Sequence, residues 1–199
     1  MHRVTSAPTG RLADTSVPIH PPIAARWSPR AFDPVTELST GDLIALLEAA
    51  RWAPTWGRRQ PVRFVVGRRG EDTFTALTGL LRRGNSYASS AAALILLCAD
   101  EGDDDVTALY SAVDTGAAMA NITIEAAARD LITHPMAGFD AAGAVAEFDL
   151  PERLRPLVIV AVGTLAQHTG VAPEISERDA APRERLPLAQ IVLNQPTQP

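Results

Sequence analysis

Residues 106–131 decide the fold class of this chain and read VTALYSAVDTGAAMANITIEAAARDL. Apolar residues recur there at helical spacing, and one face carries Tyr110, Val113, Ala117, Ala120, Ile124, Ala127 and Leu131. Because alanine is also frequent at the remaining positions, the pattern predicts one long helix that is buried on nearly all sides. Such a helix is covered only when further elements pack around it, so the segment predicts a layered domain.

Short apolar runs before and after this helix predict buried strands. They lie at residues 62–67 (VRFVVG), 92–99 (AALILLCA) and 157–163 (LVIVAVG). Helices are expected over residues 43–50, 71–83 and 140–148. Ser39 is placed to cap the first of these, and Pro54 ends it. Helices and strands that alternate in this order are typical of one mixed α/β domain.

The two ends of the chain lack clear periodicity. Residues 1–20 are rich in Thr, Ser, Pro and Gly, which predicts an irregular N-terminal arm. Residues 170–182 have a similar composition, and residues 188–193 are expected to form an extended C-terminal arm. Since no linker divides the remainder, we expect a single domain over residues 21–199.

Composition excludes several classes of protein. With 199 residues, of which 46% are hydrophobic and 21% charged, the chain is long enough for one core and is not expected to be disordered. A formal net charge of −5 provides no basic surface for nucleic acid. The longest apolar run is strand-sized, and no signal-peptide pattern is present, so we expect a cytoplasmic protein without a membrane span. One cysteine, Cys98, excludes an internal disulfide, and four scattered histidines make a metal site unexpected.

The chain contains no lysine, and all 18 basic residues are arginine. A Schiff-base lysine mechanism is therefore excluded. Any anion that a side-chain cation holds here must be held by arginine, whose guanidinium can bind a phosphate through two parallel hydrogen bonds.

No short catalytic motif in the sequence identifies a function. Asp114-Thr115-Gly116-Ala117 matches the signature of retroviral-type aspartic proteases, but that chemistry needs the aspartate in a loop. Here the tetrapeptide lies within the expected long helix, so we interpret Gly116 as a point where another backbone or ring approaches closely. Residues 102–105 (GDDD) could bind a cation, but a solvated turn is the favoured interpretation. The chain has no GxGxxG after a strand, no P-loop and no GxSxG.

Three segments carry the candidate ligand-binding residues. In residues 26–32 (RWSPRAF), extended backbone would place Arg26, Ser28 and Arg30 on one side as a clamp for an anion or a polar ring. Taken alone, an arginine pair that faces solvent is the favoured interpretation of this segment. Residues 51–61 (RWAPTWGRRQP) join a helix to a strand, and residues 133–140 (THPMAGFD) join the long helix to the next one.

Together these segments resemble the FMN-dependent nitroreductase family. The resemblance covers residues 22–192 and rests on RWSPRAF (26–32), LLEAARWAPTWGRRQPVRFVVG (46–67), GNSYA (84–88), DTGAAMANITIEAAARDLITHPMAGFD (114–140), LPERLRPLVIVAVG (150–163) and RERLPL (183–188). It implies an α+β fold, in which helices flank a mainly antiparallel sheet, and an intertwined homodimer with two FMN sites that each draw on both chains. It also implies ping-pong chemistry, in which NAD(P)H reduces the flavin at N5 and a nitroaromatic, a quinone or a similar acceptor reoxidises it.

The resemblance also implies which residues bind the cofactor. Arg26 would reach the phosphate with Arg183 and Arg185, and Arg30 would reach the N1/O2 edge of the ring, where a cation stabilises the reduced flavin. The backbone N–H of Ala137 would face N5. The full expected set is Arg26, Trp27, Ser28, Arg30, Pro54, Thr55, Trp56, Arg58, Asn85, Met136, Ala137, Gly138, Arg183 and Arg185. No catalytic side chain and no metal ligand is expected, because the cofactor carries the chemistry.

The chain departs from the family pattern at three positions. Trp56 and Arg58 stand where the family has a small serine and an asparagine. A contact between Arg58 and the ribityl chain is therefore not implied, and Trp56 would either narrow the cleft or cover the ring. Asp130 replaces a common glycine, which predicts an altered end of the long helix. His134 is interpreted as a packing or helix-end histidine. Because of these departures, two other functions stay under consideration beside an enzyme. One is a non-catalytic protein that binds flavin or another ligand on this fold, and the other is a flavin-free homologue that binds another partner.

Overall fold

The structure is a computed structural model that describes residues 11–167 and 171–194. At its centre lies a four-stranded antiparallel sheet in the order β1-β2-β4-β3. The strands are β1 (Val62–Arg68), β2 (Ala93–Asp100), β3 (Ile132–Met136) and β4 (Leu154–Gly163). The helices are α1 (Pro21–Ala25), α2 (Thr40–Arg51), α3 (Asp72–Gly79), α4 (Asp105–Ala128), α5 (Ala141–Glu147), α6 (Pro173–Ala180) and α7 (Leu188–Ile191), with 3₁₀ turns η1 (Trp56–Arg58) and η2 (Arg83–Ser90). The expected α+β class is confirmed.

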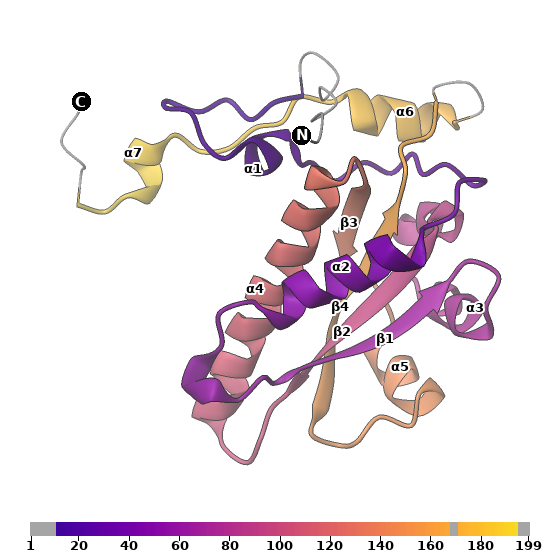
Figure 1. The fold of residues 1–199 in the computed structure, drawn as a ribbon, viewed down its shortest axis with the longest axis vertical. Helices are drawn as coiled ribbons and strands as arrows, with labels where there is room; N and C mark the ends of the chain where they lie inside the picture. Colours follow the sequence, from indigo (N-terminus) through magenta and orange to yellow (C-terminus); the bar gives the residue numbers. More distant parts are fainter. Residues whose placement is uncertain (1–10, 168–170, 195–199) are drawn as a thin grey trace.

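Helices cover both faces of this sheet, with α2 and α4 in front of it in the view of Figure 1 and α3 and α5 behind it. Leu94 and Leu96 of β2 belong to the core with Phe74 of α3, whereas Ile95 and Leu97 belong to the core with α2 and α4. Because both faces of β2 are covered, its sequence is an uninterrupted apolar run instead of an alternating one. This is why the run was recognisable as a buried strand.

The first predicted helix forms as expected. Ser39 caps α2, because its Oγ accepts a hydrogen bond from the backbone N–H of Asp42 at 3.0 Å, and the helix ends before Pro54. The prediction over residues 71–83 was too long: α3 ends at Gly79, and the chain continues into η2. η2 carries Asn85 and Tyr87 of the candidate site, as described below.

The long helix is present, but its buried face was predicted wrongly. Its core side carries Thr107, Ser111, Asp114, Thr115, Ala118, Ile122, Thr123 and Ala126, while the predicted face is open or half-buried. Thr115 tolerates burial because its hydroxyl donates to the carbonyl of Ser111 at 2.8 Å. Val113 is 58% exposed, and nothing lies within 4 Å of the position of a Cβ on Gly116, so the expected close approach there is absent from the described chain.

The end of α4 is less altered than expected. Asp130 adopts a left-handed φ of 58°, the conformation that glycine usually supplies after a helix. The N–H of Leu131 then donates to the carbonyl of Ala126 at 2.9 Å. An aspartate therefore closes the helix in the ordinary way, at a cost of about 1 kcal/mol relative to glycine.

Several elements were missed in the sequence, among them β3, α6 and the short helix α1. β3 lies where a loop between two helices was expected, and Pro135 concealed it; a proline is tolerated there because β3 is an edge strand. α6 lies within the stretch that was taken as irregular, and the expected extended arm at residues 188–193 begins as the short helix α7. Residues 11–20 contain no helix or strand, and the first ten residues of the predicted N-terminal arm lie outside the described residues.

Within residues 11–167 and 171–194, no helix combines the length and apolar character that a membrane span requires. The same ranges hold no group of three or more His, Cys, Asp or Glu side chains placed to bind a metal ion.

Candidate functional site

The Arg26–Arg30 segment leaves α1 in extended conformation. Arg26 caps α1 with φ −63° and ψ 135°, and its Nη2 donates to Ser28 Oγ at 3.1 Å. The two side chains therefore lie on one side, as the spacing predicted. Arg26 Nε is buried and has no hydrogen-bond partner. A buried donor without a partner is costly, so it marks a place where a ligand would improve the structure.

The C-terminal segment runs beside this one (Figure 1). Arg183 Nη1 donates to the carbonyl of Ala24 at 3.2 Å and to the carbonyl of Arg11. Arg11 in turn donates to the carbonyl of Ala181 at 2.8 Å, and its guanidinium lies 4.6 Å from the centre of the Trp27 ring. Arg11 is absent from the predicted site residues, because it lies in the predicted irregular arm of residues 1–20.

Four guanidinium groups gather here, and we call Arg11, Arg26, Arg183 and Arg185 the arginine cluster. Burial lowers the pKa of Arg26, and the charge of Arg185 adds to the effect. Burial also lowers the pKa of Arg183, followed by repulsion from Arg26, Arg185 and Arg11. Among the described residues, no member of the cluster forms an ion pair with an acidic side chain. An uncompensated cluster of this kind is suited to a multiply charged anion such as a phosphate.

A second group of predicted residues lies where η2 meets the end of β3. Asn85 Nδ2 donates to the carbonyl of Gly138 at 2.8 Å. A Cβ added to Gly138 would lie 2.8 Å from Asn85 Nδ2, so a larger residue here would displace the Asn85 side chain. Met136 is buried at the end of β3, and Ala137 follows it. The structure thus brings Asn85 together with residues 136–138.

Arg30 lies between these two groups. Its guanidinium is 5.7 Å from the centre of the Tyr87 ring, and Tyr87 lies 5.1 Å from the ring of His134. His134 Nδ1 is 3.0 Å from the carbonyl of Pro29. Burial lowers the pKa of His134 and raises the pKa of Tyr87 to about 12, so both side chains are neutral near pH 7. His134 therefore packs within β3 and is not at a helix end.

Asp179 was missed in the sequence and holds the same segment from the other side. It is 9% exposed, lies in α6 and accepts hydrogen bonds from the backbone N–H groups of Arg30 and Ala31. No sequence signal pointed to it, because α6 itself was not recognised.

The Thr55–Arg58 part of the predicted set lies elsewhere. Thr55 Oγ1 donates to Asp114 at 2.8 Å, the N–H of Trp56 donates to the same carboxylate at 3.0 Å, and the Trp56 ring stacks on Tyr110 at 4.9 Å. Gly57, Arg58 and Gln60 have positive φ angles of 61°, 62° and 51°. The contacts with Asp114 and Tyr110 hold this loop, and Pro54 before it, against the first half of α4.

The opposite end of α4 leads into β3. Between Asp114 and the last residue of α4, Ala128, the helix axis rises by roughly 21 Å. Figure 1 accordingly shows the loop after α2 and the start of β3 at opposite ends of α4. One chain therefore forms two groups of predicted residues that Arg30, Tyr87 and His134 connect, and a loop that stands apart from both. The first group is Arg26, Trp27, Ser28, Arg183 and Arg185, the second is Asn85, Met136, Ala137 and Gly138, and the separate loop carries Pro54, Thr55, Trp56 and Arg58.

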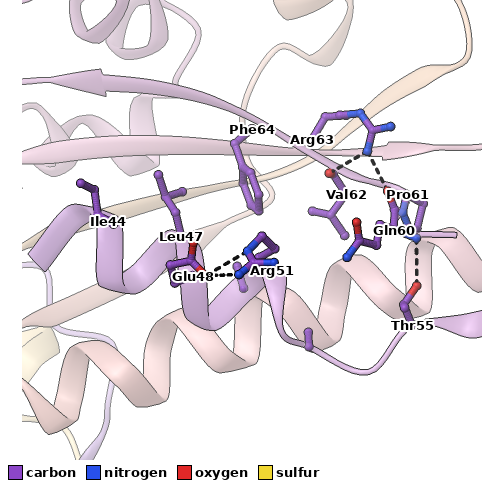
Figure 2. A pocket seen from close by; sticks show the side chains of 12 residues that line it. Ile44, Leu47, Glu48, Arg51, Thr55, Gln60, Pro61, Val62, Arg63 and Phe64 are labelled. Atoms are coloured by element: carbon purple, nitrogen blue, oxygen red, sulfur yellow. Dashed lines mark hydrogen bonds and ion pairs between the residues drawn. The ribbon is translucent and has the colours of Figure 1, made fainter. Parts of the chain in front are cut away.

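A cavity of about 460 Å³ opens between α2 and β1 (Figure 2). Its wall is apolar in the middle, and the Glu48–Arg51 ion pair at 2.6 Å lies at its rim. The lining residues are Ile44, Leu47, Glu48, Ala50, Arg51, Ala53, Thr55, Gln60, Pro61, Val62, Arg63 and Phe64. Of the predicted site residues only Thr55 lines it, so this cavity is separate from the arginine cluster.

Comparisons with known proteins point to one family. The family model described as "Nitroreductase family" matches residues 23–81 and 80–164. A solved structure described as an oxidoreductase containing FMN is 28% identical, with a TM-score of 0.84 over 93% of this chain and 96% of that chain.

Two further proteins are similar to the chain. A candidate nitroreductase from Desulfovibrio desulfuricans, solved in complex with FMN, is 25% identical with a TM-score of 0.72 over 91% of this chain and 100% of its own. The "Uncharacterized 15.4 kDa protein in ask 5'region" of Mycolicibacterium smegmatis is 54% identical over 138 residues, which are 65% of this chain and 93% of that protein.

Proposed function

The chain belongs to the nitroreductase family, and we propose that it is an FMN-dependent oxidoreductase that passes electrons from NAD(P)H to a nitroaromatic, quinone or similar acceptor. The observation that carries this proposal is the arginine cluster, in which the buried Nε of Arg26 has no partner. The similar structures that contain FMN support the choice of ligand.

The residues present fit FMN in charge and in hydrogen-bonding groups. Arg26, Arg183 and Arg185 would hold the phosphate, which removes their mutual repulsion and satisfies Arg26 Nε. Arg11 is a fourth candidate for the same contact. Asn85 and the bare backbone at Gly138 would border the ring. When bound, FMN would supply the redox chemistry by accepting a hydride from NAD(P)H at N5 and reducing the second substrate.

Two groups of this chain would then act on the ring. The backbone N–H of Ala137 would face N5 and orient it. Arg30, whose side chain is 30% exposed, would lie at the N1/O2 edge and stabilise negative charge there. His134 and Tyr87 are neutral near pH 7 and pack behind this edge, so neither competes with Arg30 for that charge.

We propose further that the protein is a homodimer and that each site is completed by the partner. The Thr55–Arg58 loop lies at the wrong end of α4 to reach the arginine cluster of its own chain. The open face of α4 carries Leu109 and Val113, which are 62% and 58% exposed. Two copies that pair these helices in opposite directions would place the loop of one beside the flavin ring of the other.

The C-terminal segment gives a second reason to propose an intertwined dimer. Leu188, Ile191 and Leu193 are 57%, 56% and 99% exposed, and α7 projects from the body in Figure 1. The apolar cavity beside β1, an edge strand, matches such a segment in chemistry. We propose that each chain lays this segment into the cavity of its partner.

The first experiment is an absorption spectrum of the purified protein before and after heat release of any ligand. Oxidised flavin absorbs near about 370 and 450 nm, and we expect these bands to be released on heating. Protein that stays colourless after incubation with excess FMN and desalting would refute the proposal. Anaerobic NAD(P)H should then bleach the bound flavin; a yellow protein that NAD(P)H leaves unbleached would favour the non-catalytic alternative, which the Trp56 and Arg58 departures support.

The dimer is tested separately by light scattering. Val113→Glu places a charge on the open face of α4 and should give monomers that have lost most of their FMN. Val35→Glu is the matched control, because Val35 is 79% exposed and lies outside α4. A wild-type monomer that retains FMN would refute the shared site.

A further inference from the structure

Asp179 is a buried carboxylate in the last turn of α6. Its two oxygens accept the backbone N–H of Arg30 at 3.0 and 2.8 Å, and Oδ2 also accepts the N–H of Ala31 at 3.0 Å. In addition, Oδ1 lies 3.8 Å from Nη1 of the Arg30 side chain. Asp179 therefore holds both the backbone and the charge of Arg30.

The position of Asp179 is electrostatically unfavourable. A carboxylate at the C-terminal end of a helix faces the negative end of the helix dipole, and burial removes water that would otherwise solvate it. Two backbone N–H groups and one guanidinium offset these costs. Since a neutral residue would avoid the costs altogether, the negative charge itself requires an explanation.

Two arginines in one segment are treated differently. Arg26, four residues before Arg30, has no acidic partner among the described residues and repels its neighbours in the arginine cluster. Arg30 alone has a buried counter-charge beside it. The fold thus leaves positive charge free at the phosphate end of the proposed site and balances it at the ring end.

We propose that Asp179 is a positioning residue that directs Arg30 toward the ring edge and sets the redox potential of the flavin by balancing the charge of Arg30. This inference rests on the proposed function. Arg30 favours the reduced ring because negative charge develops at N1, and the adjacent carboxylate weakens that attraction. Asp179 therefore keeps the potential lower than Arg30 alone would set it.

The arrangement also links the two ends of the site. Asp179 is four residues before Arg183, so one C-terminal segment fixes the ring-edge cation and supplies the phosphate-binding arginines. A displacement of α6 would change both the grip on the phosphate and the charge at the ring edge.

Asp179→Asn tests the inference, because it removes the charge and keeps the size and one acceptor oxygen. The purified holoprotein is equilibrated with a redox dye of known potential, and the ratio of reduced to oxidised flavin is read from the spectrum. We expect that ratio to rise about three- to tenfold at a fixed dye potential. Glu177→Gln is the matched control, since Glu177 lies exposed on the same helix, and its ratio should not change.

A double-mutant cycle separates charge balance from a structural role. Arg30→Gln should lower the ratio, and adding Asp179→Asn to it should raise the ratio by less than in wild type, because the carboxylate then acts on the ring only through its own field and no longer through Arg30. A ratio that Asp179→Asn leaves unchanged, or that shifts equally in the Arg30→Gln background, would overturn the inference. If Asp179→Asn does not fold, Asp179→Glu replaces it in the test. Because the negative charge is retained, the ratio should stay near the wild-type value. A rise as large as the one expected for Asp179→Asn would overturn the inference.

The two proposals fail in different ways. A wild-type protein that takes up no FMN would refute the proposed function and this inference with it. A flavoprotein whose ratio does not depend on Asp179 would refute this inference alone.

Discussion

Arg26→Met should weaken FMN binding and leave the protein without FMN as stable as before, or more stable. The substitution keeps the apolar stem and removes a guanidinium that has one side-chain hydrogen bond, to Ser28, and one buried Nε without a partner. Loss of the bond costs about 1 kcal/mol, and removal of the unsatisfied donor returns about 1–3 kcal/mol. The free energy of unfolding of the apoprotein should therefore change by about 0 to +2 kcal/mol.

Binding should respond in the opposite direction. A hydrogen bond between a guanidinium and a phosphate contributes about 1.5–3 kcal/mol, so the dissociation constant for FMN should rise about 10- to 100-fold. At an FMN concentration 100 times the wild-type constant, wild type gains about 2.7 kcal/mol, and a variant with a 30-fold weaker site gains about 0.9 kcal/mol. FMN should therefore stabilise wild type by about 1.8 kcal/mol more than it stabilises the variant.

Thermal melts with and without FMN, together with a fluorescence titration of FMN, measure both effects. Arg153→Met is the control, because Arg153 is exposed and pairs with Asp100 at the other end of β4. An apoprotein destabilised by more than about 2 kcal/mol would assign Arg26 a structural role instead. An unchanged FMN constant would refute its assignment to the phosphate.

Three further outcomes follow from local contacts. Gly67→Ala should destabilise the fold by about 1–3 kcal/mol, because its Cβ would lie 2.4 Å from the backbone nitrogen of Phe74. Gly79→Ala should be neutral or stabilising by about 0.5–1 kcal/mol, because nothing lies within 4 Å of its Cβ position. Urea unfolding measures both variants, and equal effects would contradict the packing argument. Asp114→Ala should lower the free energy of unfolding by about 1.5–3 kcal/mol and make the loop after α2 accessible to protease. An unchanged digestion pattern would show that the Asp114 carboxylate does not hold this loop. Because burial lowers the pKa of His134, the unfolded chain takes up its proton first, and the free energy of unfolding of wild type should fall as pH drops below about 6.5. His134→Gln should show a smaller fall in urea unfolding at several pH values. Parallel plots of unfolding free energy against pH for the two proteins would exclude His134 as the source of the fall.

The sheet strands that lie in the middle of the molecule were predictable. β2 and β4 are covered on both faces, so their positions are uniformly apolar and stand out against the polar turns around them. β3 is an edge strand with a histidine and a proline, and its strand character comes from pairing with β4 instead of from its own composition. Pairing of that kind is decided by residues far along the chain, which local periodicity cannot report.

The face of α4 was mistaken for a related reason. A helix built largely of alanine has little contrast between its sides, and small hydroxyl residues can be buried when they bond back to the helix backbone. The large residues Leu109 and Val113 then remain outside in the single chain. Their exposure is what the proposed dimer explains.

Within the candidate site, residues in motifs were easier to find than residues that support them. Alternation correctly placed Arg26 beside Ser28. Arg11 and Asp179 were not found, because each reaches the site from a segment without periodicity, 15 residues before Arg26 and 149 residues after Arg30 respectively. The Thr55–Arg58 loop has the motif position but lies against Asp114 in its own chain, which no local pattern could have indicated.

The arginine cluster has a practical consequence for handling the protein. Small multivalent anions should settle among the same guanidinium groups, so phosphate and sulfate buffers should raise the melting temperature of the apoprotein above its value in chloride. The same anions would compete with the cofactor during reconstitution. Preparations in phosphate and in an amine buffer should therefore differ in flavin content although their polypeptide is identical.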